Sequence, residues 1–400
     1  MVAFLLAGVS FASWASRIPN ARDALDLTPS QLGLVLLALS AGAVIALPST
    51  GWIASRVGAA KAVLWGAALV AVGLVVVGAG ASGAGLPWVV VGLFLTGLGT
   101  GGWDVSMNLE GAEVERRLGR HVMPHFHAAF SLGTVASAGV GALADWAQVS
   151  ILAHLAATSV LSFAGVCWAV RAFLPTDAHT GHQPADGQPR RHPLAAWTEP
   201  RTLLIGVVVL AAAFAEGSAN DWLSLAVTDG YGTPSWVGVL GLVAFLSAMT
   251  AGRILGTRWL DRYGRVRVLW SAFALAAVGS VLVVLGPPLG LWAAFVGSLL
   301  WGLGASLGFP VGMSAAADDP RHAAARLSVV ASIGYLAFLA GPPLLGFVGD
   351  EVGVLRSLLI VGALALPAML VVPATRPPQD TIEEPSTADV AHPGADSLVP

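Results

Sequence analysis

Asp104 has the clearest potential for chemistry in this sequence, because it interrupts a stretch of apolar residues and glycines that begins at Leu93. A charge within a membrane costs roughly 2.5–3.5 kcal/mol even on the most lenient scale. Asn108 follows one helical turn later, so one helix face would present a carboxylate and an amide. This face could bind a polar solute, and the carboxylate is a candidate proton-binding group. The alternative is a structural hydrogen bond to a neighbouring helix.

Glu216 and Asn220 form a second candidate binding group, since residues four positions apart share one face of a helix. Asp221 is next in the sequence and points elsewhere on the same helix. Together with Trp222, Asp221 could instead anchor the chain at the lipid headgroups. Glu216 is therefore preferred as a cavity residue.

His127 and Ser131 lie one turn apart near the predicted start of an apolar helix, where an imidazole could relay protons. Packing inside the bundle is an equally good interpretation. His125 follows Pro124 and is expected to be solvated, and His154 is expected at the opposite membrane interface.

Four tryptophans on different apolar segments could pack against a sugar ring, namely Trp14, Trp103, Trp222 and Trp301. Interface anchoring explains most of the 14 tryptophans of the chain, and Trp14 and Trp103 are retained as candidate binding residues. We interpret Arg253 as a residue that extends its charge to the membrane surface, and a role as an anchor for the solute is the alternative.

The sequence lacks the signatures of several other functions. No Walker A loop is present, which argues against a function driven by ATP and would leave an ion gradient as the source of energy. The nine histidines form no H-E-x-x-H pattern, and the single cysteine, Cys167, allows neither an intrachain disulfide nor a cysteine metal site. We predict no metal, no cofactor, no nucleic-acid partner and no enzyme activity. A membrane enzyme and a sensor without transport activity are minor alternatives.

Membrane-spanning helices must position these candidates. Apolar residues make up 56% of the 400 residues and charged residues 11%, with a mean hydropathy of +0.77, which excludes a soluble protein of this size. The 48 glycines suit close helix packing. We predict an all-helical membrane protein with about twelve spans. The predicted spans are residues 2–17, 31–54, 62–81, 87–109, 124–146, 150–172, 202–222, 236–257, 268–286, 291–314, 327–348 and 355–374.

The first segment is the shortest, and it lacks a basic leader. At 1.5 Å per residue it would reach only about 24 Å. We expect a span that is truncated upstream rather than a cleaved signal peptide, which would need a positively charged start.

The basic residues predict the orientation of the spans. With the N-terminus in the cytoplasm, only Arg17, Arg22 and Arg356 of the loop arginines fall on the outer side. The positive-inside rule therefore places both termini in the cytoplasm.

The breaks in the apolar pattern predict the domains. Residues 1–172 and 201–374 would each form a six-helix bundle, joined by a cytoplasmic linker at 173–200 that is rich in Pro, Gly and charge. Residues 375–400 are acidic and Pro-rich, which predicts a disordered cytoplasmic tail. Gly341-Pro342-Pro343 is a predicted hinge.

Three short patterns occur twice in the same order, about half a chain apart. They are Ser55-Arg56-Val57-Gly58-Ala59-Ala60-Lys61 with Asp261-Arg262-Tyr263-Gly264-Arg265-Val266-Arg267, Gly97-Leu98-Gly99 with Gly302-Leu303-Gly304, and Ser131-Leu132-Gly133 with Ser332-Ile333-Gly334. Such repetition predicts two homologous bundles with a solute site between them near the membrane midplane.

The twelve spans and their basic turns resemble the major facilitator superfamily, whose motif at this turn is G-x-x-x-D-R-x-G-R-R/K. The second turn matches at Asp261, Arg262, Gly264, Arg265 and Arg267, with Thr257 in place of the first Gly. The first turn keeps Gly51, Arg56, Gly58 and Lys61 and has Ser55 in place of the acid. The resemblance implies transport by alternating access, in which these turns latch the cytoplasmic gate.

The unequal turns predict a one-sided latch. By pseudosymmetry, Asp261 would face the start of span five, near Arg116, Arg117 or Arg120. Ser55 offers span eleven no charge.

Four runs resemble the fucose-permease-like branch of that superfamily and its bacterial relatives. They are Ala12-Ser13-Trp14-Ala15-Ser16-Arg17-Ile18-Pro19, Trp103-Asp104-Val105-Ser106-Met107-Asn108, Phe126-His127-Ala128-Ala129-Phe130-Ser131-Leu132-Gly133 and Glu216-Gly217-Ser218-Ala219-Asn220-Asp221-Trp222. The branch implies a small polar solute such as a sugar, moved together with protons. Its members also carry an acid in span one, which residues 2–16 lack. We predict a monomer, in contact with lipid, in the bacterial inner membrane.

A drug or metabolite/proton antiporter is the alternative. Leu93 and Phe94 stand where drug antiporters carry an arginine in span four, and span five lacks their Gly-Pro motif. These differences favour a polar solute over a drug.

Overall fold

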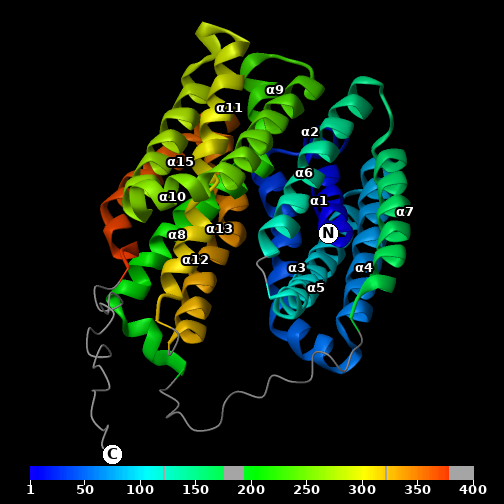
Figure 1. The fold of residues 1–400 in the computed structure, drawn as a ribbon. Helices are drawn as coiled ribbons and strands as arrows, with labels where there is room; N and C mark the ends of the chain where they lie inside the picture. Colours follow the sequence, from blue (N-terminus) through cyan, green and yellow to red (C-terminus); the bar gives the residue numbers. More distant parts are fainter. Residues whose placement is uncertain (120–121, 175–192, 320–321, 378–400) are drawn as a thin grey trace, which may run out of the picture.

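A computed structural model describes residues 1–119, 122–174, 193–319 and 322–377, and within these ranges the regular structure is entirely helical. Figure 1 shows two bundles of long helices side by side, one from each half of the chain. Most of the predicted linker, the predicted tail beyond residue 377 and Arg120 lie outside the described residues.

The first bundle contains seven α-helices in the described ranges. Helix α1 lies within the first predicted span, residues 2–17, and α2 extends this span beyond its predicted end. Their bounds are α1 Val2–Ala15, α2 Ile18–Ala24, α3 Pro29–Val57, α4 Ala59–Ala79, α5 Leu86–Leu118, α6 Met123–Trp146 and α7 Ile151–Ala169.

The second bundle follows a short 3-10 turn at Pro193–Thr198. Its helices are α8 Pro200–Ser218, α9 Ser224–Tyr231, α10 Ser235–Leu285, α11 Leu291–Ala305, α12 Gly308–Ala316, α13 Ala323–Val352, α14 Val354–Ser357 and α15 Leu359–Val371. Pro342 and Pro343 of the predicted hinge lie inside the continuous helix α13.

Helix α10 contains two predicted spans. Its 51 residues would measure about 76 Å as one straight helix, more than twice the roughly 30 Å of a hydrocarbon core. The helix bends at Gly264, whose φ of 76° and ψ of 162° lie where residues with side chains are strained. Eleven helices in the described ranges are long and apolar enough to cross a membrane, so the bend brings the number of spans to twelve. The predicted fold class is confirmed.

Glycine contacts show that the two bundles repeat the same packing. A Cβ atom on Gly97 would meet the backbone oxygen of Leu39, and one on Gly302 would meet that of Phe245, the corresponding position of the second bundle. The neighbouring glycines show the same correspondence. A Cβ atom on Gly99 would meet the backbone oxygen of Gly66, and one on Gly304 would meet that of Ala272. Small residues let these helices approach at the backbone, and the repeated sequence patterns therefore correspond to repeated contacts.

We expect Gly97→Ala to destabilise the protein, because the obstacle is the backbone of α3 and not a movable side chain. Overpacking of this kind costs about 1–3 kcal/mol. Gly139→Ala on α6 is the matched control, since no atom lies within 4 Å of its Cβ position. Thermal unfolding in detergent should show a lower midpoint for Gly97→Ala alone. Equal midpoints for the two variants would contradict the packing argument.

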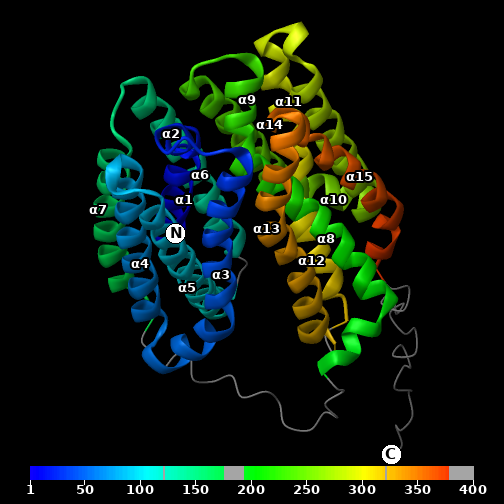
Figure 2. The ribbon, with the colours of Figure 1, turned by 180° about the vertical axis from the view of Figure 1, so that it is seen from behind.

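The two bundles meet at one end of the molecule. We call the end that carries Leu174 and Pro193 the linker face and the opposite end the distal face. Backbone atoms of Pro29 and Gly33 on α3 pack against Gly346 and Pro342 on α13, on the distal side. Towards the linker face the ribbons of the two bundles diverge (Figures 1 and 2). The structure therefore shows a state that is closed at the distal face.

Candidate functional site

Asp104 and Asn108 lie on one face of α5, as the sequence predicts. The side-chain nitrogen of Asn108 donates to Oδ1 of Asp104 over 3.2 Å and to the backbone oxygen of Asp104 over 2.9 Å. Both residues are half-buried. The carboxylate thus has a partner within its own helix and keeps accepting capacity for a solute.

Tyr335 on α13 faces Asp104 from the second bundle, near enough for an electrostatic interaction between the two side chains. Its ring lies against Phe338, with 6.4 Å between the ring centres. A carboxylate of the first bundle therefore lies within electrostatic range of a phenol of the second, and Phe338 packs beside that phenol.

Glu216 forms an ion pair with Arg253 inside the second bundle. Arg253 donates from one nitrogen to both carboxylate oxygens of Glu216, over 2.9 and 2.8 Å, and from Nε to the backbone oxygen of Ser306 over 3.4 Å. Both side chains are less than one-third exposed. The interpretation of Arg253 as a residue that reaches for the membrane surface was wrong, because its guanidinium points to a carboxylate on α8.

His127 on α6 lies across the bundle boundary from Arg253, whose charge reaches the imidazole. The imidazole makes an edge contact with Phe4, with 5.4 Å between ring centres. His127 is exposed, as is His125. The first bundle therefore presents an imidazole and a carboxylate to the cationic and phenolic groups of the second.

Asn220 and Asp221 lie in a π-helical turn, Ala219–Leu223, between α8 and α9. This wider turn replaces the α-helical spacing that the sequence suggested between Glu216 and Asn220. Asn220 is 6% exposed, and its Oδ1 has no hydrogen-bond partner among the described residues. Single π turns occur often at functional sites. Trp222 is fully buried, so it does not anchor the chain at the lipid headgroups.

The four candidate tryptophans are at most 2% exposed, and their indole nitrogens find no acceptor in the described chain: Trp14, Trp103, Trp222 and Trp301. Trp301 packs edge-on against Phe245. In this state Trp14 and Trp103 fill helix contacts, and neither presents an open aromatic face.

A buried polar cluster at the distal face was missed by the sequence analysis. Arg17 is 1% exposed; its Nε donates to Nδ1 of His154 over 3.0 Å, and its Nη2 donates to the backbone oxygen of Val149 over 2.8 Å. Its Nη1 lies 3.6 Å from Oδ1 of Asp145, which is itself 3% exposed. This distal cluster joins α2, α6 and α7.

The distal cluster also reaches the second bundle. Ser235, at the start of α10, donates to Oδ2 of Asp145 over 2.5 Å, and Asn20 donates to Oδ1 of Asp145 over 2.7 Å. Nearby, Arg22 makes a bidentate pair with Asp229 over 2.7 and 2.9 Å. The distal closure is thus polar as well as steric.

Each basic turn contains a glycine in a conformation that other residues rarely adopt. Gly58 and Gly264 both have positive φ, 86° and 76°. Arg56 lies over the ring of Trp52, and Arg262 lies over that of Tyr263.

Asp261 is exposed, and no ion pair joins it to a described residue. Arg116 and Arg117 pair instead with Glu113 on their own helix. The expected contact between Asp261 and span five is therefore not made in this distal-closed state.

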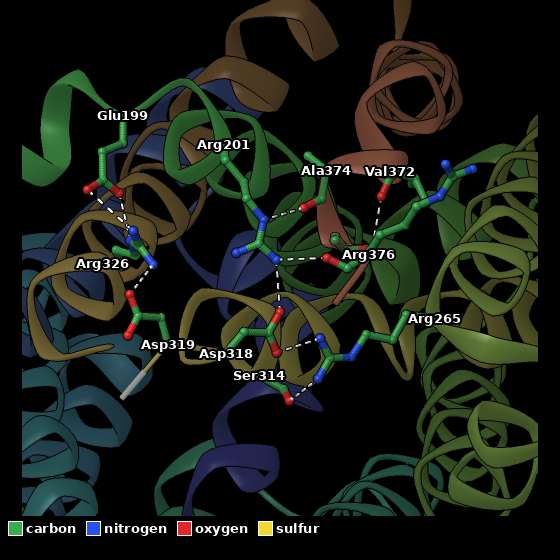
Figure 3. A network of polar contacts seen from close by, with 11 residues as sticks. Glu199, Arg201, Arg265, Ser314, Asp318, Asp319, Arg326, Val372, Ala374 and Arg376 are labelled. Carbon is green, nitrogen blue, oxygen red and sulfur yellow. Dashed lines mark hydrogen bonds and ion pairs between the residues drawn. The ribbon is translucent and has the colours of Figure 1, made fainter. Parts of the chain in front are cut away.

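Arg265 belongs to an ionic network at the linker end of the second bundle (Figure 3). Asp318 accepts from Arg265 over 2.7 Å and from Arg201 over 2.8 Å, while Arg265 also donates to Ser314. Arg201 in turn binds the backbone oxygens of Ala374 and Arg376. These bonds tie the start of α8 and the end of α12 to the bend of α10 and to the residues after α15.

Glu199, Arg326 and Asp319 form a second ionic group beside this network in Figure 3. Arg326 donates to Glu199 over 2.6 Å, and its guanidinium holds the pKa of Glu199 below its usual value. The pair therefore stays ionised at neutral pH. It attaches the residue that precedes α8, Glu199, to helix α13. Within the described ranges, no three His, Cys, Asp or Glu side chains gather where they could hold a metal ion.

Two bundles with repeated packing, closed at one face around facing polar groups, define a membrane transport protein. The model of the Major Facilitator Superfamily matches residues 1–325 and 235–395. The chain belongs to this superfamily, and it is an integral membrane transporter and not an enzyme.

Relatives and solved structures agree with this assignment. An uncharacterised MFS-type transporter of Yersinia pestis is 30% identical over 87% of this chain and 88% of its own length. The uncharacterised transporter y4wD of Sinorhizobium fredii is 30% identical over 93% and 96%, respectively. The crystal structure of the nucleoside transporter NupG covers 94% of this chain and 98% of its own, with a TM-score of 0.75 at 14% identity. The human organic anion transporter MFSD10 covers 93% and 98%, with a TM-score of 0.65 at 17% identity.

Proposed function

We propose that this protein is a secondary active transporter that moves a small polar solute, such as a sugar or a related metabolite, together with protons. The observation that carries this proposal is the set of polar groups that face one another across the bundle boundary. Asp104 and His127 come from the first bundle, and Tyr335 and Arg253 come from the second. A solute bound between them would contact both bundles, which is what alternating access requires.

The chemistry of these groups favours a hydroxylated solute. Asp104 and Glu216 can accept hydrogen bonds from hydroxyl groups, and Asn108 and Tyr335 can donate as well as accept. Because Glu216 neutralises Arg253, this arginine is not a free cation that could anchor an anionic solute. Asp104 has no cationic partner among the described residues, which makes it the preferred proton carrier.

The linker face is the cytoplasmic face in this proposal, because most basic loop residues lie there. The state with a closed distal face would then be open towards the cytoplasm of a bacterial cell. In the opposite state, the turns with Arg56 and Gly58 and with Asp261, Arg262, Gly264 and Arg265 would close the cytoplasmic gate. We propose that the transporter works as a monomer surrounded by lipid.

A proton-driven exporter is the second candidate, since the fold serves both directions. NupG is a nucleoside transporter and MFSD10 an organic anion transporter, so the shared fold alone leaves the solute open. The ion pair of Glu216 with Arg253 favours a polar solute over a lipophilic cation, because Arg253 already occupies the Glu216 carboxylate that such a cation would need.

Proteoliposomes with an imposed pH gradient test the proposed function. Labelled sugars and nucleosides are screened for uptake, and lipophilic cations are screened for extrusion. We expect one polar solute to accumulate when the outside is acidic, and a protonophore to abolish the accumulation. Cation extrusion without polar-solute uptake would establish the exporter instead.

A further inference from the structure

A pocket of about 430 Å³ opens at the linker end of the second bundle, outside the boundary between the bundles. It is lined by Tyr263, Gly264, Arg265, Val266, Arg267, Trp270, Arg376 and Pro377. We call it the arginine pocket. It brings the bend of α10 next to the residues that follow α15.

Two of its three arginines carry charge that nothing in the described chain neutralises. Arg265 is engaged by Asp318 and Ser314. Arg267 and Arg376 are exposed, and neither forms an ion pair with a described residue. The backbone of Arg376 is fixed, because its carbonyl oxygen accepts from Arg201 (Figure 3). The arginine pocket thus carries two guanidinium groups whose charge an anion could neutralise.

Exposed apolar residues lie on α15, the helix to which Trp270 of the arginine pocket is hydrogen-bonded. Trp270 donates its indole N–H to the backbone oxygen of Met369 over 2.8 Å and remains 40% exposed. Leu366 and Leu370 on α15, one turn apart, are 63% and 82% exposed. A molecule with an anionic group in the arginine pocket could therefore lay an attached apolar chain along α15.

We propose that the arginine pocket binds the phosphate headgroup of an anionic glycerophospholipid, whose acyl chains lie along Leu366 and Leu370. The guanidinium groups of Arg267 and Arg376 hold the phosphate, and Tyr263 and Trp270 lie at the level of the headgroup. A free phosphate would use the same arginines but leave the leucines uncovered. The bound lipid fastens the bend of α10 to the end of α15, and this bend is part of the turn that Arg262 and Gly264 form.

Lipid titration of the purified full-length chain tests this proposal. Binding of phosphatidylglycerol and of phosphatidylcholine is measured by native mass spectrometry after release from detergent. Near a membrane surface each arginine contributes about fivefold to the affinity for an anionic lipid, so Arg267→Gln with Arg376→Gln should weaken phosphatidylglycerol binding about 25-fold. Phosphatidylcholine binding should not change.

The matched control is Lys61→Gln with Arg171→Gln, which removes two exposed cations from the linker ends of first-bundle helices. This variant should bind phosphatidylglycerol like the natural chain. Equal weakening by both double variants would overturn the proposal, because the effect would then be one of overall charge. Displacement of the lipid by an equal concentration of inorganic phosphate would show a simple anion site and would also overturn it.

The acidic residues after Pro377 are the other possible occupant of the arginine pocket. A chain that ends at Pro377 distinguishes the two. If the truncation makes phosphatidylglycerol binding at least tenfold tighter, the tail is the occupant and the proposal fails. If binding is unchanged, the lipid is supported. The measurement needs no transported solute, so its outcome is independent of the proposed transport function.

Discussion

Asp104→Asn should abolish proton-driven solute accumulation while the protein still folds. Asparagine keeps the size of the side chain and can accept from Asn108, so the local geometry of α5 survives. It cannot carry a proton or a charge. Losing a hydrogen bond to a charged group costs about 1.5–3 kcal/mol, which corresponds to an apparent solute affinity about 10- to 150-fold weaker.

The stability of the Asp104→Asn variant separates a functional role from a structural one. Removing an uncompensated carboxylate from a membrane-spanning helix relieves its desolvation, so the variant should unfold at the same or a higher temperature. Asp26→Asn is the matched control, because Asp26 is exposed near the distal face and its positive φ of 50° suits asparagine. Uptake into proteoliposomes with and without a pH gradient is the measurement. Undiminished accumulation by Asp104→Asn would exclude this residue as the proton carrier.

The sequence predicted those features that depend on short distances along the chain. Asn108 lies four residues after Asp104, and helical spacing alone brings the two side chains together. The long apolar segments predicted the spans, and the repeated glycine patterns predicted packing that the two bundles share.

Pairs that join different helices could not be predicted in the same way. Glu216 meets Arg253 because α8 and α10 have particular rotations about their axes, and no local pattern encodes those rotations. For the same reason Arg17 was treated only as a loop arginine of the outer side, although it lies in one cluster with Asp145. The useful signal was present, since Arg17 lies in an apolar context between Ala15 and Ile18 and is therefore placed to be buried.

The predicted latch at Asp261 belongs to a conformational state other than the distal-closed one. The predicted latch at Asp261 needs the linker ends of the bundles to meet, and here they diverge. In the distal-closed state, the distal cluster joins the two bundles at the opposite face from that latch. Its contribution to stability can therefore be tested directly.

Arg17→Met should destabilise the distal-closed state more than any other single change proposed above. It removes the cation beside Asp145, which is 3% exposed, and an orphaned buried charge costs about 3–5 kcal/mol. Opening of the distal face would let water reach the carboxylate, so we expect the population to shift towards that opening. Adding Asp145→Asn removes the second charge and should restore most of the lost stability.

Arg22→Met is the matched control, because Arg22 also joins the bundles but pairs with Asp229 where solvent reaches both groups. An exposed pair contributes about 0–1 kcal/mol, so this variant should behave almost like the natural chain. Opening is measured with Leu36→Cys, which is 1% exposed on α3, in a Cys167→Ser background and with a membrane-impermeant maleimide. Faster labelling with Arg17→Met, reversed by Asp145→Asn, is the expected result. If Arg17→Met and Arg22→Met label and unfold alike, the distal cluster has no special part in closure, and the steric packing of α3 on α13 must close the distal face alone.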